Sequence, residues 1–159
     1  MRITRYTDYS LRVLMYVALK GDTLSTIAEI ASAYGISKNH LMKVVQELAA
    51  KGYLQAIRGK NGGMRLSRAP EDINVGTLVR DTEQDLELVD CFGNKSTCVI
   101  TPVCELKRVL AKALNAFFST LDNYTLADLL PEASQPELIQ LLGIAEFTNA
   151  AAPEEIDRQ

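Results

Sequence analysis

The chain contains an Asn61-Gly62 pair between two short segments in which apolar residues alternate with other residues. The alternating apolar positions are Leu54 and Ala56 before the pair, and Met64 and Leu66 after it. Asn-Gly in this setting is the strongest short-range signal for a β-hairpin, because both central residues of a type I′ turn need a positive φ. The segment therefore predicts two antiparallel strands joined by a two-residue turn.

A first amphipathic helix is predicted well before this hairpin. Thr7 is a suitable N-cap, and the helix runs to about Lys20, where Gly21 ends it. Apolar residues recur at the i, i+3, i+4 and i+7 spacing of one buried face, namely Leu11, Leu14, Met15 and Ala18. The segment contains Asp8 and Arg12, so we interpret it as a buried amphipathic helix and not as a secretory leader.

The stretch STIAEIASAYG predicts a second helix that is short and well capped. Either Ser25 or Thr26 can be its N-cap, and Thr26 and Glu29 have the spacing of a capping box. Gly35 is a suitable stop. The residues predicted to face inward are Ile27, Ile30 and Ala31.

A third helix follows after a two-residue break, with Ser37 as its N-cap and Gly52 as its stop. Its apolar stripe consists of Leu41, Val44, Val45 and Leu48. Two short capped helices joined by a glycine turn form a helix-turn-helix. With the hairpin after the third helix, the predicted fold class is mainly α with a small β-hairpin, a winged helix-turn-helix domain followed by a long dimerisation helix.

The rest of the chain predicts this long helix and the segments around it. Asn74 can cap a short helix through about Thr82, and the long amphipathic helix begins at Pro102. Its stripe consists of Leu106, Leu110, Ala113, Phe117 and Leu121, widened by Val109 and Leu114. A stripe of this length favours burial against a second copy over packing on its own domain. The predicted parts are the winged domain 1–82, a loop 83–104, the dimerisation helix and following segment 105–130, and a tail 131–159 with a disordered end.

Charge is distributed unevenly between the two halves of the chain. Residues 1–80 contain 12 Lys and Arg against 6 Asp and Glu, whereas residues 81–159 contain 5 against 14. A basic N-terminal half indicates contact with a polyanion, and together with a helix-turn-helix this favours double-stranded DNA. No uncharged run approaches the roughly 18 residues that a membrane-spanning helix needs, so we expect a cytoplasmic protein with no membrane partner.

The third helix carries the residues expected to read DNA. A recognition helix reaches base edges with residues near its N-terminus. The candidates on this helix are Ser37, Lys38, Asn39, His40, Lys43 and Gln46. Around the hairpin, Arg58, Lys60, Arg65 and Arg68 are expected to meet the backbone or the minor groove. The only histidine, His40, is thereby assigned to DNA contact and not to metal binding or acid-base work.

All three cysteines lie in the stretch CFGNKSTCVITPVC, as Cys91, Cys98 and Cys104. An odd, clustered set in a reducing compartment indicates metal or redox chemistry and not disulfides. Thiolates suit zinc and iron-sulfur clusters, but the spacing lacks the tight CxxC pairs of most structural zinc sites. Three thiolates leave a fourth ligand to be found elsewhere in the assembly.

The whole of residues 1 to about 130 resembles the winged-helix iron-sulfur regulators, the family that includes IscR, and within it the nitric-oxide-sensing repressors. The stretches that carry the resemblance are TDYSLRVLMYVA, GISKNHLMKVVQELAAKGYLQAIRGKNGGMRL, the three cysteines followed by ELK, and LDNYTLADLL. The IscR type has a histidine three residues after its last cysteine. Here that position is Lys107, which cannot be a ligand at neutral pH.

The resemblance implies a homodimer with crossed long helices and an iron-sulfur cluster held by the three cysteines. From the residues alone, the favoured role of Asp8 is structural, as a helix N-terminal acid paired with Arg12 at i+4. The resemblance implies instead that Asp8 of the partner subunit is the fourth ligand, with Arg12 beside it. The implied function is a repressor whose operator binding is controlled by a cluster that senses nitric oxide.

Several alternatives remain open at this stage. A 4Fe–4S cluster is preferred, but a 2Fe–2S cluster has the same ligand count. A cluster-free thiol switch of the same fold and a zinc-stabilised interaction module are the other candidates. An enzyme with Cys98 or Cys104 as nucleophile is not expected, because no catalytic arrangement of Ser, His and Asp, phosphate loop or paired carboxylates is present.

Overall fold

A computed structural model of the chain describes residues 2–83, 85–93 and 97–144. The helices are α1 (Arg5–Lys20), α2 (Ile27–Tyr34), α3 (Lys38–Ala50), α4 (Val75–Thr82), α5 (Glu105–Leu121) and α6 (Gln135–Leu141), and the strands are β1 (Leu54–Ile57) and β2 (Gly63–Leu66). Short 3-10 turns lie at Pro70–Asp72, Asp90–Phe92, Thr101–Val103, Ala127–Leu129 and Glu132–Ser134. The mainly α fold with a small antiparallel hairpin is the predicted one.

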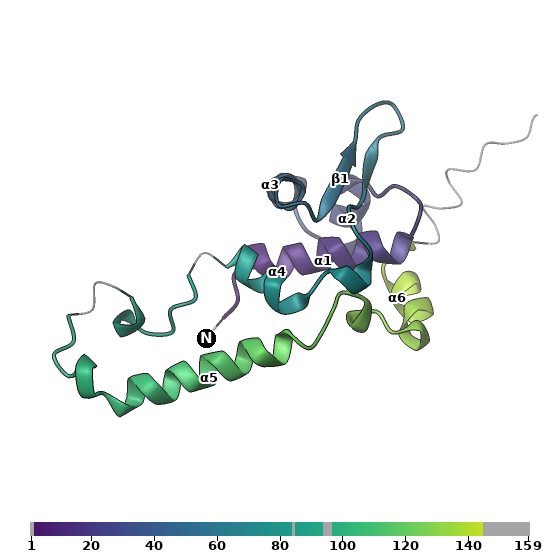
Figure 1. Cartoon of the computed structure of the whole chain (residues 1–159). Coiled ribbons are helices and arrows are strands. Elements are labelled where there is room, and N and C mark those ends of the chain that lie inside the picture. The colour runs from purple at the N-terminus through teal and green to yellow at the C-terminus, as the bar shows by residue number, and fades with distance from the viewer. Residues whose placement is uncertain (1, 84, 94–96, 145–159) are drawn as a thin grey trace, which may run out of the picture.

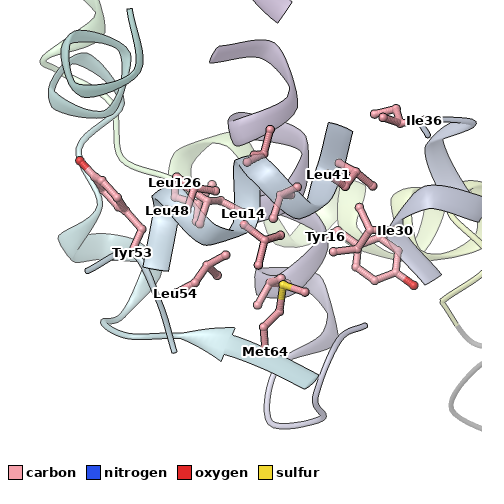
Figure 2. Close-up of a cluster of buried hydrophobic side chains, with 14 of the residues drawn as sticks. Leu14, Tyr16, Ile30, Ile36, Leu41, Leu48, Tyr53, Leu54, Met64 and Leu126 are labelled. Carbon is pink, nitrogen blue, oxygen red and sulfur yellow. The ribbon is translucent and has the colours of Figure 1, made fainter. Parts of the chain in front are cut away.

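Helix α1 lies at the centre of the molecule, with α3 and the hairpin on one side and α5 and α6 on the other (Figure 1). The main core forms where α1, α2, α3 and the hairpin meet. Figure 2 shows this cluster, which includes Leu14, Ile30, Leu41, Leu48, Leu54 and Met64. Each of these side chains is at most 3% exposed, so the winged domain has a continuous apolar interior.

The chain returns to this core after α5. The Leu126 amide donates to the Ile73 carbonyl at 2.8 Å, and Leu126 is 1% exposed within the main cluster. Ile144, at the end of the described part, is buried in the same cluster. The segment after α5 therefore packs on the winged domain. The predicted division of the chain into four parts stays a prediction, and the predicted disordered end falls on residues 145–159, outside the described residues.

The predicted caps of α2 and α3 are confirmed. Thr26 forms a capping box with Glu29, and Gly35 ends α2 with a φ of 63° in the left-handed region. The Ser37 hydroxyl accepts a hydrogen bond from the His40 amide at the start of α3. The apolar stripe predicted for α3 is the set of its buried residues. Local capping chemistry therefore predicts the helix-turn-helix correctly.

The predicted cap of the first helix is wrong. Helix α1 begins at Arg5, and its N-cap is Thr4, whose hydroxyl accepts from the Thr7 amide at 3.2 Å. Thr7 itself is fully buried in the first turn, and its hydroxyl lies 3.1 Å from that of Thr4. Both threonines can cap a helix, and the first one in the chain does so here.

The predicted two-residue turn of the hairpin is also wrong. The register pairs Leu54 with Leu66 and Ile57 with Gly63, which leaves the five residues 58–62 as the connection. Among the described residues outside glycine, none has a positive φ, so Asn61 cannot form a type I′ turn. The positive φ, 124°, belongs to Gly59.

Helix α5 starts later than predicted and buries a different phenylalanine. Pro102 lies in a 3-10 turn, and α5 starts at Glu105 with Cys104 as its N-cap. Phe118, outside the predicted stripe, is the buried residue of this helix, and it packs with Val75 and Val79 of α4. Phe117 is half-buried at the edge of the same cluster. The C-terminal half of α5 is therefore fixed to the winged domain.

Candidate functional site

The outer face of α3 is exposed along its whole length. Every residue predicted to read DNA from this helix is exposed, namely Ser37, Lys38, Asn39, His40, Lys43 and Gln46. The opposite face is buried in the main core. The fold thus presents the polar face of α3 to solvent beside the hairpin, as a recognition helix requires.

Met42 lies on this exposed face and was missed by the sequence reasoning, which looked for polar side chains. It is 56% exposed. Within residues 2–83, Ile3 and Met42 are the large apolar side chains found exposed. An apolar side chain on a DNA-reading face can contact the methyl group of thymine. The sequence did contain a signal for this exposed side chain, since Met42 is a large apolar residue that lies outside the apolar stripe of α3.

The hairpin places two of its predicted cations in the connecting loop. Arg58 and Lys60 are exposed there. Arg65 is exposed on β2, and its Nε donates to Gln55 Oε1 at 2.9 Å. Arg68 differs, since it donates to the Gly52 carbonyl at 3.2 Å and lies over the ring of another residue, Tyr53, at 4.7 Å. Arg68 therefore supports the base of the hairpin.

The three cysteines lie on the segment between α4 and α5. Cys91 is half-buried in the turn Asp90–Phe92, Cys98 is exposed, and Cys104 is half-buried at the N-terminus of α5. None of them forms a disulfide. Within the described residues of one chain, no three His, Cys, Asp or Glu side chains lie close enough to hold a metal ion. The predicted ligands are thus three cysteines outside disulfides that the described part of a single chain does not bring together.

Cys104 is the cysteine that takes part in capping α5. Its Sγ accepts a hydrogen bond from the Lys107 amide at 3.4 Å and so caps α5. Lys107 contributes its backbone to this cysteine, and no histidine is nearby in the sequence to complete a ligand set.

Asp8 lies in the first half of α1 and pairs with Arg12. The carboxylate Oδ1 accepts from Arg12 Nε at 3.0 Å, and the two side chains are 38% and 43% exposed. The Arg12 guanidinium also lies 5.7 Å from the centre of the Tyr34 ring, at the end of α2. Within one chain Asp8 therefore has the ion pair expected from the residues. Its role as a ligand for the partner subunit stays a prediction.

An apolar stripe is exposed next to the cysteines. Val99, Ile100, Val103, Leu106 and Val109 are between 56% and 92% exposed. Leu106 and Val109 lie on the first turns of α5, the half of the helix that projects away from the winged domain in Figure 1. Exposed apolar side chains that follow one another so closely along the chain favour an interaction surface here.

The helices in the described part of the chain were compared with the requirements of a membrane span. None of them combines the necessary length and apolar character.

Comparison with known proteins gives one consistent family. Residues 3–132 match the model of the Rrf2 family, described as iron-dependent transcriptional regulators. The HTH-type transcriptional regulator NsrR of Bacillus licheniformis is 54% identical over 132 residues, covering 82% of this chain and 92% of that protein. NsrR of Bacillus subtilis is 51% identical over 148 residues, covering 92% and 100%.

Solved structures give the same fold at lower identity. IscR of T. potens superposes with a TM-score of 0.67 at 26% identity, covering 84% of this chain and 88% of that one. CymR, the global cysteine regulator of B. subtilis, also has a TM-score of 0.67 at 26% identity, covering 81% and 95%. Both similarities cover more than four fifths of this chain.

Proposed function

Because the chain belongs to the Rrf2 family of transcriptional regulators, we propose that it is a DNA-binding repressor controlled by an iron-sulfur cluster that senses nitric oxide. The family predicted from the sequence is confirmed, and so is the prediction of a regulator that is not an enzyme. The observation that carries the proposal is the exposed polar face of α3 beside the hairpin, in a chain that also has three cysteines on the segment between α4 and α5.

In this proposal α3 lies in the major groove of the operator. Asn39 and Gln46 can bond adenine edges, Lys43 can reach guanine, and Met42 can contact a thymine methyl. Arg58 and Lys60, in the exposed connection of the hairpin, meet the backbone or the minor groove. These contacts combine base reading with phosphate neutralisation, so the affinity falls steeply as salt is raised.

The repressor works as a homodimer. The exposed stripe on the first half of α5 is apolar and continues onto residues 99–103. A second copy of the same helix covers such a stripe symmetrically, and a two-fold dimer matches two half-sites of an operator. The spacing of the two recognition helices is then set by the α5 contact.

Cys91, Cys98 and Cys104 fit an iron-sulfur cluster by their chemistry. None of them forms a disulfide, and thiolates are the ligands that such clusters take in proteins. Such a cluster supplies iron that reacts with nitric oxide. The three cysteines would hold it, and Asp8 of the partner subunit would complete the ligand set. A 4Fe–4S cluster suits this set best, and a cluster held by reduced thiols suits a cytoplasmic protein.

Asp8 gives the control mechanism in this proposal. As a ligand, Asp8 connects α1 of one subunit to the cysteine segment of the other, next to the dimer contact. When it is released, it can return to Arg12, the partner it has in the single chain. Since α1 packs on α3, the exchange changes how the two recognition helices are held relative to each other. The operator affinity then falls.

The test is anaerobic purification of the full chain with iron, sulfide and spectral analysis. Nitric oxide is then titrated while operator binding is followed. We expect iron and sulfide in stoichiometric amounts and a loss of DNA binding as nitric oxide is added. A colourless protein that binds DNA would support the thiol switch instead, and one zinc per chain without DNA binding would support the interaction module.

Variants separate the proposed ligands. Cys104→Ser should lose the iron, whereas Asp8→Ala should keep it and respond differently to nitric oxide. Asp22→Ala is the matched control, since Asp22 is an exposed acid just beyond the end of α1. If Asp8→Ala has the spectrum and the nitric oxide response of Asp22→Ala, Asp8 is not a ligand.

A further inference from the structure

A cleft of about 270 Å³ lies between the N-terminal half of α1 and the exposed face of α3. Its walls come from both helices, with Arg5, Tyr6 and Tyr9 on α1, and His40, Lys43, Val44 and Glu47 on α3. The rings of Tyr9 and His40 face each other across it, with centres 6.5 Å apart and planes tilted by 38°. The cleft is therefore a built feature of the packing between α1 and α3.

The cleft divides the exposed residues of α3 into two parallel rows. Asn39, Met42 and Gln46 follow the i, i+3, i+7 spacing of one helix face, and His40, Lys43 and Glu47 follow the same spacing one residue later. The second row lines the cleft and faces α1. The first row does not line it, so it is the row available to base edges when α3 lies in a groove.

Positive charge predominates in the cleft. Arg5 and Lys43 are exposed cations, and Glu47 is the carboxylate among the lining residues. Burial raises the pKa of Tyr6 above its usual value, and the nearby Glu47 carboxylate raises it further. The Tyr6 hydroxyl therefore stays protonated, and because it is buried it is not a donor to the cleft. Arg5, Lys43, His40 and the Tyr9 hydroxyl remain as donors for an anion.

We infer that this cleft binds one backbone phosphate of the operator, beside the groove that α3 reads. The inference rests on the proposed DNA-binding function and deepens it. The DNA interface then extends from α3 onto α1, through Arg5 and Tyr9, which the sequence reasoning did not include. His40 and Lys43, placed among the base readers by the sequence and by the proposal above, contact the backbone instead. Phosphate contacts of this kind fix the register of a recognition helix in its groove.

A small free anion would use the same donors, so the test must separate it from DNA. The probe is a duplex that contains the site selected by the full-length, cluster-loaded protein from a random-sequence pool. Binding is measured over a range of salt concentrations for the wild type and for Arg5→Gln and Tyr9→Phe. Lys51→Gln is the matched control, because Lys51 is an exposed cation at the far end of α3.

Arg5→Gln should weaken binding by about tenfold at physiological salt, because a charge-assisted contact is lost in each subunit. The log-log slope of affinity against salt should become less steep by about 2, one contact per subunit. Tyr9→Phe should weaken binding with a smaller change of slope, since it removes a neutral donor. Lys51→Gln should change neither quantity, and thermal unfolding checks that each variant is folded.

A neutral methylphosphonate placed at single positions of the duplex tests the same contact without altering the protein. At one position per half-site, the methylphosphonate should weaken the binding of the wild type. At the same position it should hardly change the affinity of Arg5→Gln, which has already lost the contact. If no position behaves in this way and Arg5→Gln binds like Lys51→Gln, the inference is overturned and the proposed function stands. A free anion in the cleft would give that same result. If the wild type shows no salt-dependent DNA binding, both are overturned.

Discussion

Arg80 holds Asp122 through two hydrogen bonds, 2.6 Å from Nη1 to Oδ1 and 2.8 Å from Nη2 to Oδ2. The pair joins α4 to the residue directly after α5. The guanidinium also lies 4.5 Å from the centre of the Phe118 ring, and the Asn74 side chain donates to the Asp122 carbonyl at 2.7 Å. In the proposed dimer this junction transmits the position of α5 to the winged domain.

Gly76 allows Asp122 to approach the backbone of α4 closely. A Cβ at this position would overlap the Asp122 carboxylate and come within 3.0 Å of the Asp122 backbone nitrogen. Gly76→Ala should therefore destabilise the protein by about 1–3 kcal/mol, the usual range for overpacking. Urea unfolding measures this. In an Asp122→Ala background the cost should be smaller, because the overlapping carboxylate is gone. Equal costs in both backgrounds would contradict the proposed contact.

Tyr53 gives a prediction for the alkaline range. Its hydroxyl donates to Asp81 Oδ2 at 2.5 Å, and burial, with a further contribution from Asp81, raises the pKa of Tyr53 above its usual value. The protonated phenol is favoured in the folded state, so the stabilisation is complete below the unfolded pKa of about 10 and declines as the pH rises above it. Tyr53→Phe should cost about 1 kcal/mol near neutral pH.

The same variant should make stability fall less steeply above pH 10 than in the wild type, an approximate threshold set by the unfolded tyrosine. Tyr16, whose pKa is raised to about 12 mainly by burial, still contributes to the decline, so a partial effect is expected. Tyr124→Phe serves as control, because Tyr124 is 48% exposed. An alkaline slope unchanged by Tyr53→Phe would exclude the Asp81 hydrogen bond as its cause.

Capping and periodicity predicted the winged domain because they depend on neighbouring residues alone. Thr26, Gly35 and Ser37 each act within one turn of helix, and the structure has them where the sequence indicates. Which of two threonines caps α1, and which phenylalanine of α5 is buried, depend on packing with distant elements. Neighbouring residues do not carry that information.

The candidate metal site could be predicted only in part, for a different reason. The cysteines are evident in the sequence, but within the described residues one chain does not bring three ligands together. The Arg5 and Tyr9 side of the α1–α3 cleft was missed because it depends on a contact between two helices that are distant in sequence. Such contacts leave no short motif.

The connection of the hairpin allows a direct test between the predicted and the observed turn. A Cβ on Gly62 would overlap the Ile57 carbonyl and approach Gly59 to 3.0 Å, so a glycine is needed here for space. Gly62→Ala should distort the wing and weaken DNA binding. Asn61→Ala should be nearly neutral for stability, because Asn61 is exposed and has no positive φ. A type I′ turn would make Asn61→Ala costly, and urea unfolding with DNA titration distinguishes the two.

The exposed stripe on α5 predicts how dimerisation can be lost without unfolding the chain. Val109 is 61% exposed in the single chain, so Val109→Glu costs little in packing there but buries a charge in the proposed dimer. Sedimentation should show a monomer, and operator affinity should fall. Asn115→Glu is the control, since at 100° per residue Asn115 lies about 120° around the helix from Val109 and on the side opposite Leu106. A dimeric Val109→Glu would place the interface elsewhere.

Met42 predicts a dependence on thymine methyl groups. Its side chain is 56% exposed in the row formed with Asn39 and Gln46. Replacing thymines of the selected duplex by deoxyuridine removes the methyl groups and leaves the pairing edges intact. At one position this replacement should lower the affinity of the wild type by a few-fold, which corresponds roughly to the free energy of burying one methyl group.

Met42→Ala should bind the thymine duplex less tightly and be insensitive to deoxyuridine at that position. Asn39→Ala should bind less tightly but keep the full sensitivity, because it alters a polar contact to a different edge. For each variant, the quantity to compare is the ratio of its affinities for the thymine duplex and the deoxyuridine duplex. A loss of stability or of folded fraction lowers both affinities equally, so it cancels in this ratio. If both variants keep the sensitivity, the methyl group is read by another residue, and Met42 does not contribute to specificity.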